Sequence, residues 1–388
     1  MKRLLALILA LIFCLSLVAC TTSGKADKDT GKDDQNTQTD DNNDNNDNKE
    51  EEKKPPEIVD KTYYITSYLD NFKLHGRTSA INNGLACDTS ASGIEFNAYI
   101  EGDLKMQLSV SQNCYFTLYI DGERVEERIN RRPADNSTEL VLATFTDKKV
   151  HNIRFLKQTE AQCALSVFQN VSFKGYFEAP PADKEILIEV LGDSITVGFG
   201  NLCDRETPNS GSAPYQDATQ TYGFLAAEKL NADVSLVCYS GIGVSIGWPS
   251  FLMEEYFKAD SFVRNRNTPF VAKRVPDVVV INLGTNDQTK GIDIQKLKTK
   301  VKALVDLVRE TYGKKVPIVW VHGMMEKASL TNFQIVFEAL YKDADKKLVY
   351  FLPVMQENLG GGGHPSLNAH YKVSETLAKY LKENILNK

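Results

Sequence analysis

After Lys184, five short apolar runs alternate with longer helix-like segments, and this alternation constrains the fold more than any other feature of the chain. The apolar runs span residues 186–191, 234–238, 278–283, 316–321 and 348–351. Residues 292–311, with apolar side chains every three or four positions, and residues 372–386 are predicted to be helices. Strands that alternate with helices favour a parallel sheet covered by helices. We therefore predict an α/β domain with a parallel five-stranded sheet over residues 182–388.

Residues 57–181 follow a different period, in which alternate side chains are apolar. Three such runs lie at residues 94–100, 104–110 and 116–120, and this pattern is typical of strands with one buried face. The dipeptide Asp-Gly directly after the third run indicates a hairpin turn. We predict an all-β sandwich of the jelly-roll type, which ends at a stiff Pro-Pro linker at residues 180–181.

The first 19 residues have the pattern of an export signal peptide. Lys2 and Arg3 precede an apolar run over residues 4–15, and small residues precede Cys20. The apolar run is shorter than the roughly 20 residues that a membrane-spanning helix needs. The end of the segment resembles a bacterial lipobox, which implies cleavage before Cys20 and attachment of lipid to this cysteine. We therefore expect an extracellular protein that is lipid-anchored to the outer face of the cell membrane.

A polar tether follows the predicted lipidation site and extends over residues 20–56. Residues 21–56 carry six lysines, eleven acidic residues and no aromatic residue. Such a segment buries too little apolar surface to offset the entropy lost on ordering. We expect a disordered spacer between Cys20 and the first folded domain.

The composition excludes several classes of function. A formal net charge of -6 provides no basic field for nucleic acid, so we expect no nucleic-acid partner. The sequence contains no CxxC or HExxH motif, and its five histidines are scattered; we therefore expect no metal and no cofactor. Beyond Cys14 and Cys20, the number of cysteines is odd, which leaves at least one of them unpaired. No protein partner can be inferred from these features.

Four residues that can carry chemistry follow predicted strands at one edge of the sheet. Ser194 comes directly after the first strand, Gly241 after the second, Asn286 after the third and His364 after the fifth. Sheets of this kind bind ligands beyond the carboxyl ends of their strands. Ester hydrolysis needs a hydroxyl nucleophile, an imidazole base and donors aimed at the oxyanion, and this edge offers each of them.

These four residues occur in this order, with Ser194 in a GDS motif and His364 in an HP motif. In this respect residues 185–388 resemble the SGNH or GDSL esterase family. The resemblance implies a three-layer α/β fold with Ser194 as nucleophile and His364 as its base. It also implies an oxyanion hole formed by the backbone N–H groups of Ser194 and Gly241 and by the side chain of Asn286.

A β-sandwich ahead of such a domain, with the motif WVHGMM after the fourth strand, looks like the family two carbohydrate esterases, which remove acetyl groups from sugars. That family often places an aspartate just before the catalytic histidine, whereas residues 360–363 are all glycine. We therefore predict a Ser194–His364 pair without a neighbouring carboxylate, in which a backbone carbonyl orients the ring. The alternative is a triad with a distal acid. Glu357 is the first candidate for this acid, and Asp287 is the second.

Each candidate residue also has a purely structural interpretation. Ser194 can cap the helix that follows it. His364 alone fits a surface loop, and Asn286 and Gly241 fit ordinary turns. Trp248 is either a substrate platform or a packing residue.

Four further polar residues near these motifs are expected to be structural. We expect Asp193 and Asp287 to bond loop backbone rather than perform chemistry. His322 and His370 fit structural or solvent-facing roles.

The leading functional hypothesis is removal of acetyl groups from polysaccharide or oligosaccharide through an acyl-enzyme on Ser194. A lysophospholipase or general short-chain esterase is an alternative, because the same motifs serve other acyl chains. A third hypothesis is a glycan-binding surface lipoprotein with weak or no turnover, which the glycine run before His364 favours. The expected partners are an acetylated carbohydrate substrate and the membrane, the latter through lipid on Cys20.

Overall fold

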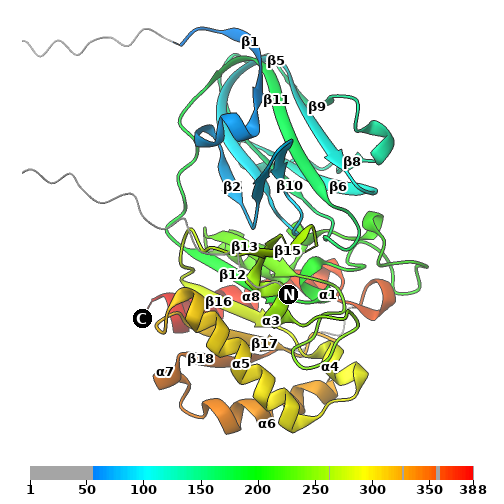
Figure 1. The fold of residues 1–388 in the computed structure, drawn as a ribbon, viewed down its shortest axis with the longest axis vertical. Helices are drawn as coiled ribbons and strands as arrows, with labels where there is room; N and C mark the ends of the chain where they lie inside the picture. Colours follow the sequence, from blue (N-terminus) through cyan, green and yellow to red (C-terminus); the bar gives the residue numbers. More distant parts are fainter. Residues whose placement is uncertain (1–55, 262, 326, 355–358, 388) are drawn as a thin grey trace, which may run out of the picture. The chain divides into compact units, whose positions relative to one another are not determined.

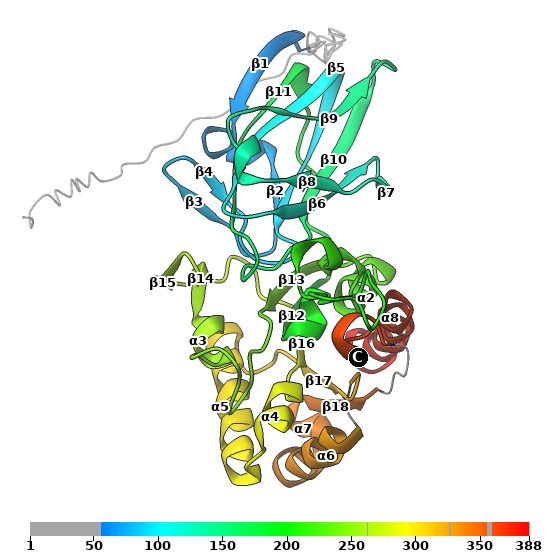
Figure 2. The ribbon, with the colours of Figure 1, turned by 90° about the vertical axis from the view of Figure 1, so that its right-hand side faces the viewer.

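The first domain is built from an antiparallel network of eleven strands. The computed structural model describes residues 56–261, 263–325, 327–354 and 359–387, and Figure 1 and Figure 2 show their fold. The main path of the network is β3-β4-β11-β5-β10-β6-β7, and the remaining four strands pair onto it. The strands are β1 Val59–Tyr64, β2 Lys73–His75, β3 Ser79–Ile81, β4 Gly84–Ala86, β5 Gly93–Val110, β6 Cys114–Ile120, β7 Glu123–Arg124, β8 Ile129–Arg131, β9 Leu140–Phe145, β10 Val150–Lys157 and β11 Ser166–Phe177. The prediction of an all-β domain is confirmed, while Cys20 and the signal peptide lie outside the described residues.

Strand β5 corrects one detail of the sequence analysis. The runs at residues 94–100 and 104–110 are predicted as separate strands, but they form one strand of 18 residues. Between the two runs lies Gly102, whose φ of 77° suits glycine. Pairing continues on both sides of this point, because β11 pairs with residues 98–110 of β5, and β10 pairs with residues 93–99. A short turn therefore does not separate the two runs.

The predicted hairpin after the third run is confirmed. Strands β6 and β7 pair antiparallel, with Ile120 opposite Glu123. The two residues between them, Asp121 and Gly122, have φ values of 54° and 84°. Positive φ at both central positions is the signature of a type I′ turn, whose twist matches that of the strands.

The second domain contains a parallel sheet of five strands, as predicted, and the structure gives their order as β13-β12-β16-β17-β18. These strands are β12 Leu187–Gly192, β13 Asp233–Cys238, β16 Val278–Asn282, β17 Ile318–His322 and β18 Val349–Pro353. The helices are α1 Ser194–Val197, α2 Tyr222–Lys229, α3 Met253–Lys258, α4 Thr285–Lys290, α5 Ile294–Tyr312, α6 Lys327–Tyr341, α7 Ala344–Lys347 and α8 Leu367–Leu381. A small antiparallel pair, β14 Ala259–Ser261 and β15 Asn265–Pro269, follows α3. No strand or helix crosses the boundary that we predict between residues 181 and 182, since β11 ends at Phe177.

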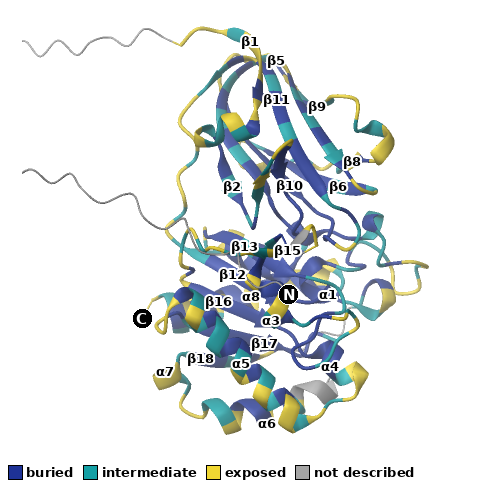
Figure 3. Ribbon diagram, viewed as in Figure 1, coloured by how far each residue is buried: buried dark blue, intermediate teal, exposed yellow. Residues whose placement is uncertain are grey.

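Both faces of the parallel sheet are buried, which gives the domain its three layers. Side chains that alternate along β12 divide between two cores: Val190 packs with α2 and α8, and Leu191 packs with α3 and α5. Figure 3 shows the central strands as buried along most of their length. This arrangement explains why the strands are continuous apolar runs rather than alternating ones.

The last helix begins earlier than its apolar pattern predicts. The apolar pattern predicts a start at residue 372, whereas α8 starts at Leu367. The Ser366 hydroxyl accepts a hydrogen bond from the backbone N–H of Ala369 and so caps the helix. The helix therefore starts five residues before the predicted position. None of the helices in the described part of the chain combines the length and the apolar character required to cross a membrane.

Candidate active site

Ser194 lies at the carboxyl edge of the parallel sheet, directly after β12. It is the first residue of α1, and Asp193 occupies the N-cap position, where its carboxylate accepts a hydrogen bond from the N–H of Ile195 at 3.0 Å. The interpretation of Ser194 as a helix cap is therefore wrong. The turn into α1 is tight: a Cβ atom on Gly192 would lie 1.8 Å from Oγ1 of Thr196, so only glycine fits there.

His364 meets Ser194 across the edge of the sheet. Its Nε2 atom lies 2.8 Å from the Ser194 hydroxyl oxygen, which is the distance of a nucleophile paired with its base. The two residues are 170 positions apart in the chain, and β12 and the segment before α8 bring them together. The Phe199 ring stacks on the imidazole at a centroid distance of 4.2 Å and limits its rotation. The interpretation of His364 as an unattached loop residue does not hold.

Burial lowers the pKa of His364 to about 4, against the opposing effect of the backbone of Gly362 and Gly361. The imidazole is consequently neutral near pH 7, the state in which Nε2 can accept a proton. Its other nitrogen, Nδ1, is buried and makes no hydrogen bond to any residue that the structure describes. Thus no carboxylate of the described residues orients the ring, and the backbone carbonyl that we predict in this role makes no hydrogen bond with Nδ1. Glu357 lies outside those residues.

The glycine run before His364 lies tightly against the loop after α1. Gly361 donates to the carbonyl of Gly200 at 2.9 Å, and Gly362 donates to the carbonyl of Arg205 at 3.1 Å. A Cβ atom on Gly361 would lie 2.4 Å from Cβ of Ser210, and Gly362 has a φ of 60°. The glycines therefore allow the backbone of this run to pack closely against the loop after α1. These contacts fix the position of His364 relative to Ser194.

The three predicted oxyanion donors gather around the same edge. No described residue accepts a hydrogen bond from the backbone N–H of Ser194 or of Gly241, so both groups remain available to a ligand. Gly241 adopts a φ of 80°, which favours glycine at this turn. The Asn286 amide nitrogen donates to the carbonyl of Ile242 at 2.9 Å and to the Asp193 carboxylate at 3.2 Å. The oxyanion role of all three donors stays a prediction.

Two buried aspartates support this edge, as the sequence analysis expects. Asp287 accepts hydrogen bonds from the backbone of Val244, Ser245 and Ile246 at 2.6 to 3.0 Å and holds the loop that leads to Trp248. With its oxygens committed to this loop, Asp287 does not act as the third acid. Burial raises the pKa of Asp193 to about 7, and the nearby charge of Asp287 adds to the effect.

Glu160, which the sequence analysis does not identify, reaches this edge from the β domain. Its side chain is buried and accepts hydrogen bonds from the backbone N–H of Ser240 at 2.9 Å and from the Ser240 hydroxyl at 2.7 Å. The amide of Gln216 donates a third hydrogen bond at 3.0 Å. Burial raises the pKa of Glu160, while these donors and the charge of Lys157 oppose the shift. Because Ser240 precedes Gly241, Glu160 fixes one wall of the predicted oxyanion site.

Trp248 lies beside the predicted oxyanion site and faces solvent. Its backbone N–H donates to the Gly241 carbonyl at 2.9 Å, and 62% of the residue is exposed. The Lys290 ammonium lies 3.6 Å from the ring centroid. Of the two roles expected for Trp248, the packing role is wrong; its role as a substrate platform stays a prediction.

His322 and His370 are structural and do not face solvent. Both are fully buried. The His322 ring stacks on Phe333 at 4.3 Å, and Nδ1 of His370 accepts a hydrogen bond from the N–H of Tyr222 at 3.2 Å. Burial lowers the pKa of His322 to about 4 and that of His370 to about 3.

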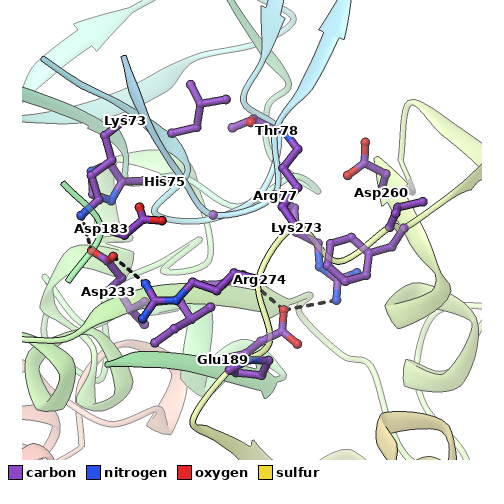
Figure 4. A pocket seen from close by; sticks show the side chains of 18 of the residues that line it. Lys73, His75, Arg77, Thr78, Asp183, Glu189, Asp233, Asp260, Lys273 and Arg274 are labelled. Carbon is purple, nitrogen blue, oxygen red and sulfur yellow. Dashed lines mark hydrogen bonds and ion pairs between the residues drawn. The ribbon is translucent and has the colours of Figure 1, made fainter. Parts of the chain in front are cut away.

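A pocket of about 480 Å³ lies at the opposite edge of the sheet and takes no part in this site. It is lined by residues at the amino ends of β12 and β13, and Figure 4 shows that several of its charged side chains pair with one another. Asp233 pairs with Lys73 at 2.7 Å and with Arg274 at 3.2 Å, while Arg77 pairs with Glu189 at 3.3 Å. The pairs of Lys73 with Asp233 and of Arg77 with Glu189 join the two domains, so we interpret the pocket as part of their contact.

Elsewhere, the described part of the chain contains no group of three or more His, Cys, Asp or Glu side chains that could hold a metal ion. The five cysteines of this part are free thiols, in agreement with the expectation that at least one stays unpaired.

Each of the two domains matches a known family. Residues 190–368 match the GDSL-like lipase/acylhydrolase family, and residues 74–181 match the carbohydrate esterase 2 N-terminal family. Cellulase/esterase CelE of Acetivibrio thermocellus is 28% identical over 320 residues, which are 78% of this chain and 38% of that protein. The acetylxylan esterase / glucomannan deacetylase of Cellvibrio japonicus is 22% identical over 348 residues, which are 84% of this chain and 92% of that protein. The chain thus spans well under half the length of CelE but most of the Cellvibrio protein.

Solved structures share the same pair of domains. A family two carbohydrate esterase from Clostridium thermocellum in complex with cellohexaose has a TM-score of 0.73 at 25% identity, over 80% of this chain and 98% of that one. The acetyl xylan esterase Est2A from Butyrivibrio proteoclasticus has a TM-score of 0.74 at 20% identity, over 84% of this chain and 98% of that one. The likeness to Est2A concerns the fold.

Proposed function

Because the chain joins the two domains of the family two carbohydrate esterases, we propose that it is a serine esterase that removes acetyl groups from polysaccharide or oligosaccharide. The observation that carries the proposal is the 2.8 Å contact between the Ser194 hydroxyl and Nε2 of His364. The relatives named above as an acetylxylan esterase / glucomannan deacetylase and as a cellulase/esterase support a carbohydrate substrate. A pure binding protein has no physical need for a nucleophile paired with a buried neutral imidazole.

The reaction proceeds through two acyl transfers. Ser194 Oγ attacks the acetyl carbonyl carbon while His364 Nε2 takes the hydroxyl proton, and the oxyanion that forms faces the N–H groups of Ser194 and Gly241. Collapse of this intermediate breaks the bond to the sugar oxygen, which receives the proton from His364 and leaves. Water then attacks the acetyl-serine with His364 as base, and acetate departs from Ser194. No cofactor enters either step.

Release of the acyl group, as acetate or as fatty acid, across a substrate panel tests the proposal. The panel contains acetylated xylan, acetylated glucomannan, short-chain esters, and lysophospholipid as a long-chain ester. We expect release from the acetylated polysaccharides, and its near-complete loss in Ser194→Ala and in His364→Ala. A preference for lysophospholipid would favour the lysophospholipase alternative. Binding of glycan without release of acetate by the wild-type protein would favour the glycan-binding alternative.

We further propose that the mature protein is anchored to the outer face of the cell membrane through lipid on Cys20. An export signal, a lipobox-like cysteine and a polar tether follow one another in the sequence, which supports this order of processing. We expect the wild-type protein in the membrane fraction of expressing cells. Cys20→Ser should release or mislocalise it, and identical fractionation of the two proteins would contradict the anchor.

A further inference from the structure

The β domain contains a second pocket that is lined by uncharged polar side chains. Its volume is about 440 Å³, and its lining holds five amide side chains, those of Asn82, Asn83, Gln107, Gln169 and Asn170, but no charged residue. Strands β1, β4, β5 and β11, the turn after β3 and the 3-10 turn after β1 supply its walls; Figure 2 shows how these strands lie in the domain. None of the lining residues belongs to the active site. We call this feature the amide pocket.

Three of its residues form a row across neighbouring strands. Tyr64 of β1 lies opposite Asn170 of β11, which in turn lies opposite Gln107 of β5. Residues that lie directly opposite one another project from the same face of a sheet. The adjacent row, which includes Val171 and Met106, is buried in the core, so the row of Tyr64 projects from the other face.

A β-bulge places two amides side by side in this pocket. The register of β11 against β5 shifts between Phe168 and Asn170, so that Gln169 has no residue opposite it. The side-chain carbonyl oxygens of Gln169 and Asn170 are buried and accept no hydrogen bond from any described residue. Asn170 is only 9% exposed. Buried acceptors of this kind are uncommon in proteins, because an unmade hydrogen bond is costly, and they point to a donor outside the chain.

The lining determines the chemistry of the missing donor. A pocket without charged groups favours a neutral ligand, and amide groups pair with hydroxyl groups as both donors and acceptors. Tyr64 is 60% exposed and offers an aromatic face, against which the C–H groups of a sugar ring can pack. We propose that the amide pocket is a non-catalytic binding site for a neutral glycan chain. Its role is to hold polysaccharide on the enzyme, which goes beyond the proposed function because binding here requires neither Ser194 nor His364.

Calorimetric titration of the full chain carrying Ser194→Ala tests this site, because the substitution prevents turnover. The probes are cellohexaose, xylohexaose and mannohexaose, all of them uncharged. We expect at least one of them to bind, and we expect Tyr64→Ala and Gln169→Ala each to weaken that binding by about tenfold or more. Asn130→Ala is the matched control, because Asn130 is an exposed amide of the same domain that bonds only Asn113 among the described side chains. Thermal unfolding of each variant shows whether it is folded.

The outcomes separate this site from the active site. If none of the three sugars bound, or if binding survived unchanged in folded Tyr64→Ala and Gln169→Ala proteins, the inference would be overturned. Removal of all binding by Trp248→Ala, with Tyr64→Ala unaffected, would place the glycan in the active site and overturn it as well. Binding that fails in Tyr64→Ala but not in Asn130→Ala supports the inference even if wild-type protein released no acetate, so the two proposals fail separately.

Discussion

Replacement of Glu160 by glutamine tests whether the β domain positions the oxyanion site. One Glu160 oxygen accepts from the Ser240 hydroxyl at 2.7 Å and from the Gln216 amide at 3.0 Å, and the other accepts from the Ser240 N–H at 2.9 Å. Glutamine keeps one oxygen and gains an NH₂ group. If the oxygen faces the Ser240 N–H, the NH₂ group faces the Gln216 amide, which is also a donor, so one hydrogen bond is lost.

The hydrogen bonds of Glu160 determine how much Glu160→Gln should change the free energy of unfolding and kcat. Loss of one hydrogen bond to a charged group costs about 1.5–3 kcal/mol, and relief from burying that charge offsets part of it. The change in the free energy of unfolding should therefore stay within about 2 kcal/mol. Ser240 adjoins Gly241, and a small displacement of an oxyanion donor is costly, so we expect kcat to fall roughly ten- to hundredfold with little change in KM.

The assay compares kcat for acetyl ester hydrolysis with urea unfolding of the same protein. Glu228→Gln is the matched control, because Glu228 also joins the two domains but pairs with Arg154 at 3.0 Å, apart from the oxyanion site. Its side chain is 34% exposed, so its loss should cost about 1 kcal/mol or less and leave kcat almost unchanged. A folded Glu160→Gln protein with the kcat of wild type, or a kcat loss equal to that of Glu228→Gln, would refute the positioning role.

Three further predictions concern the predicted catalytic groups. Asn286→Ala should lower kcat by a factor of about 10² to 10³ while leaving the protein folded, and near-normal turnover would remove Asn286 from the mechanism. Burial lowers the pKa of His364 to about 4, and only the neutral ring accepts a proton. We therefore expect kcat/KM to stay constant between neutral pH and about pH 5 and to fall as the pH drops through about 4. A midpoint near the ordinary histidine pKa of about 6.5 would contradict this expectation. Glu357→Gln should retain most activity, and a loss comparable to that of His364→Ala in a folded protein would establish a distal triad acid.

The sequence was most informative where a short pattern determines a position. The apolar runs predict the parallel sheet, and the carboxyl ends of parallel strands share one edge, so Ser194 and His364 could be placed together although 170 positions separate them. Likewise, the dipeptide at residues 121–122 predicts the hairpin because the turn itself requires positive φ.

Contacts between the two domains could not be predicted in the same way. Glu160 lies 80 positions before Ser240, in a loop of the β domain, and no period or motif connects the two residues. The stacking of Phe199 on His364 likewise depends on how the loop after α1 folds. The apolar pattern does not predict the start of α8 or the continuity of β5, because a helix cap determines the first and pairing with neighbouring strands determines the second.

The most direct test of the account is to identify the residue that becomes acetylated during turnover. The enzyme is mixed with an acetylated xylooligosaccharide, quenched with acid before the substrate is exhausted, digested and analysed by mass spectrometry. We predict one acetyl group on the peptide that contains Ser194 in wild-type protein, and neither this label nor acetate release in Ser194→Ala. Acetate release by folded Ser194→Ala protein at the wild-type rate would contradict the central claim that Ser194 is the nucleophile.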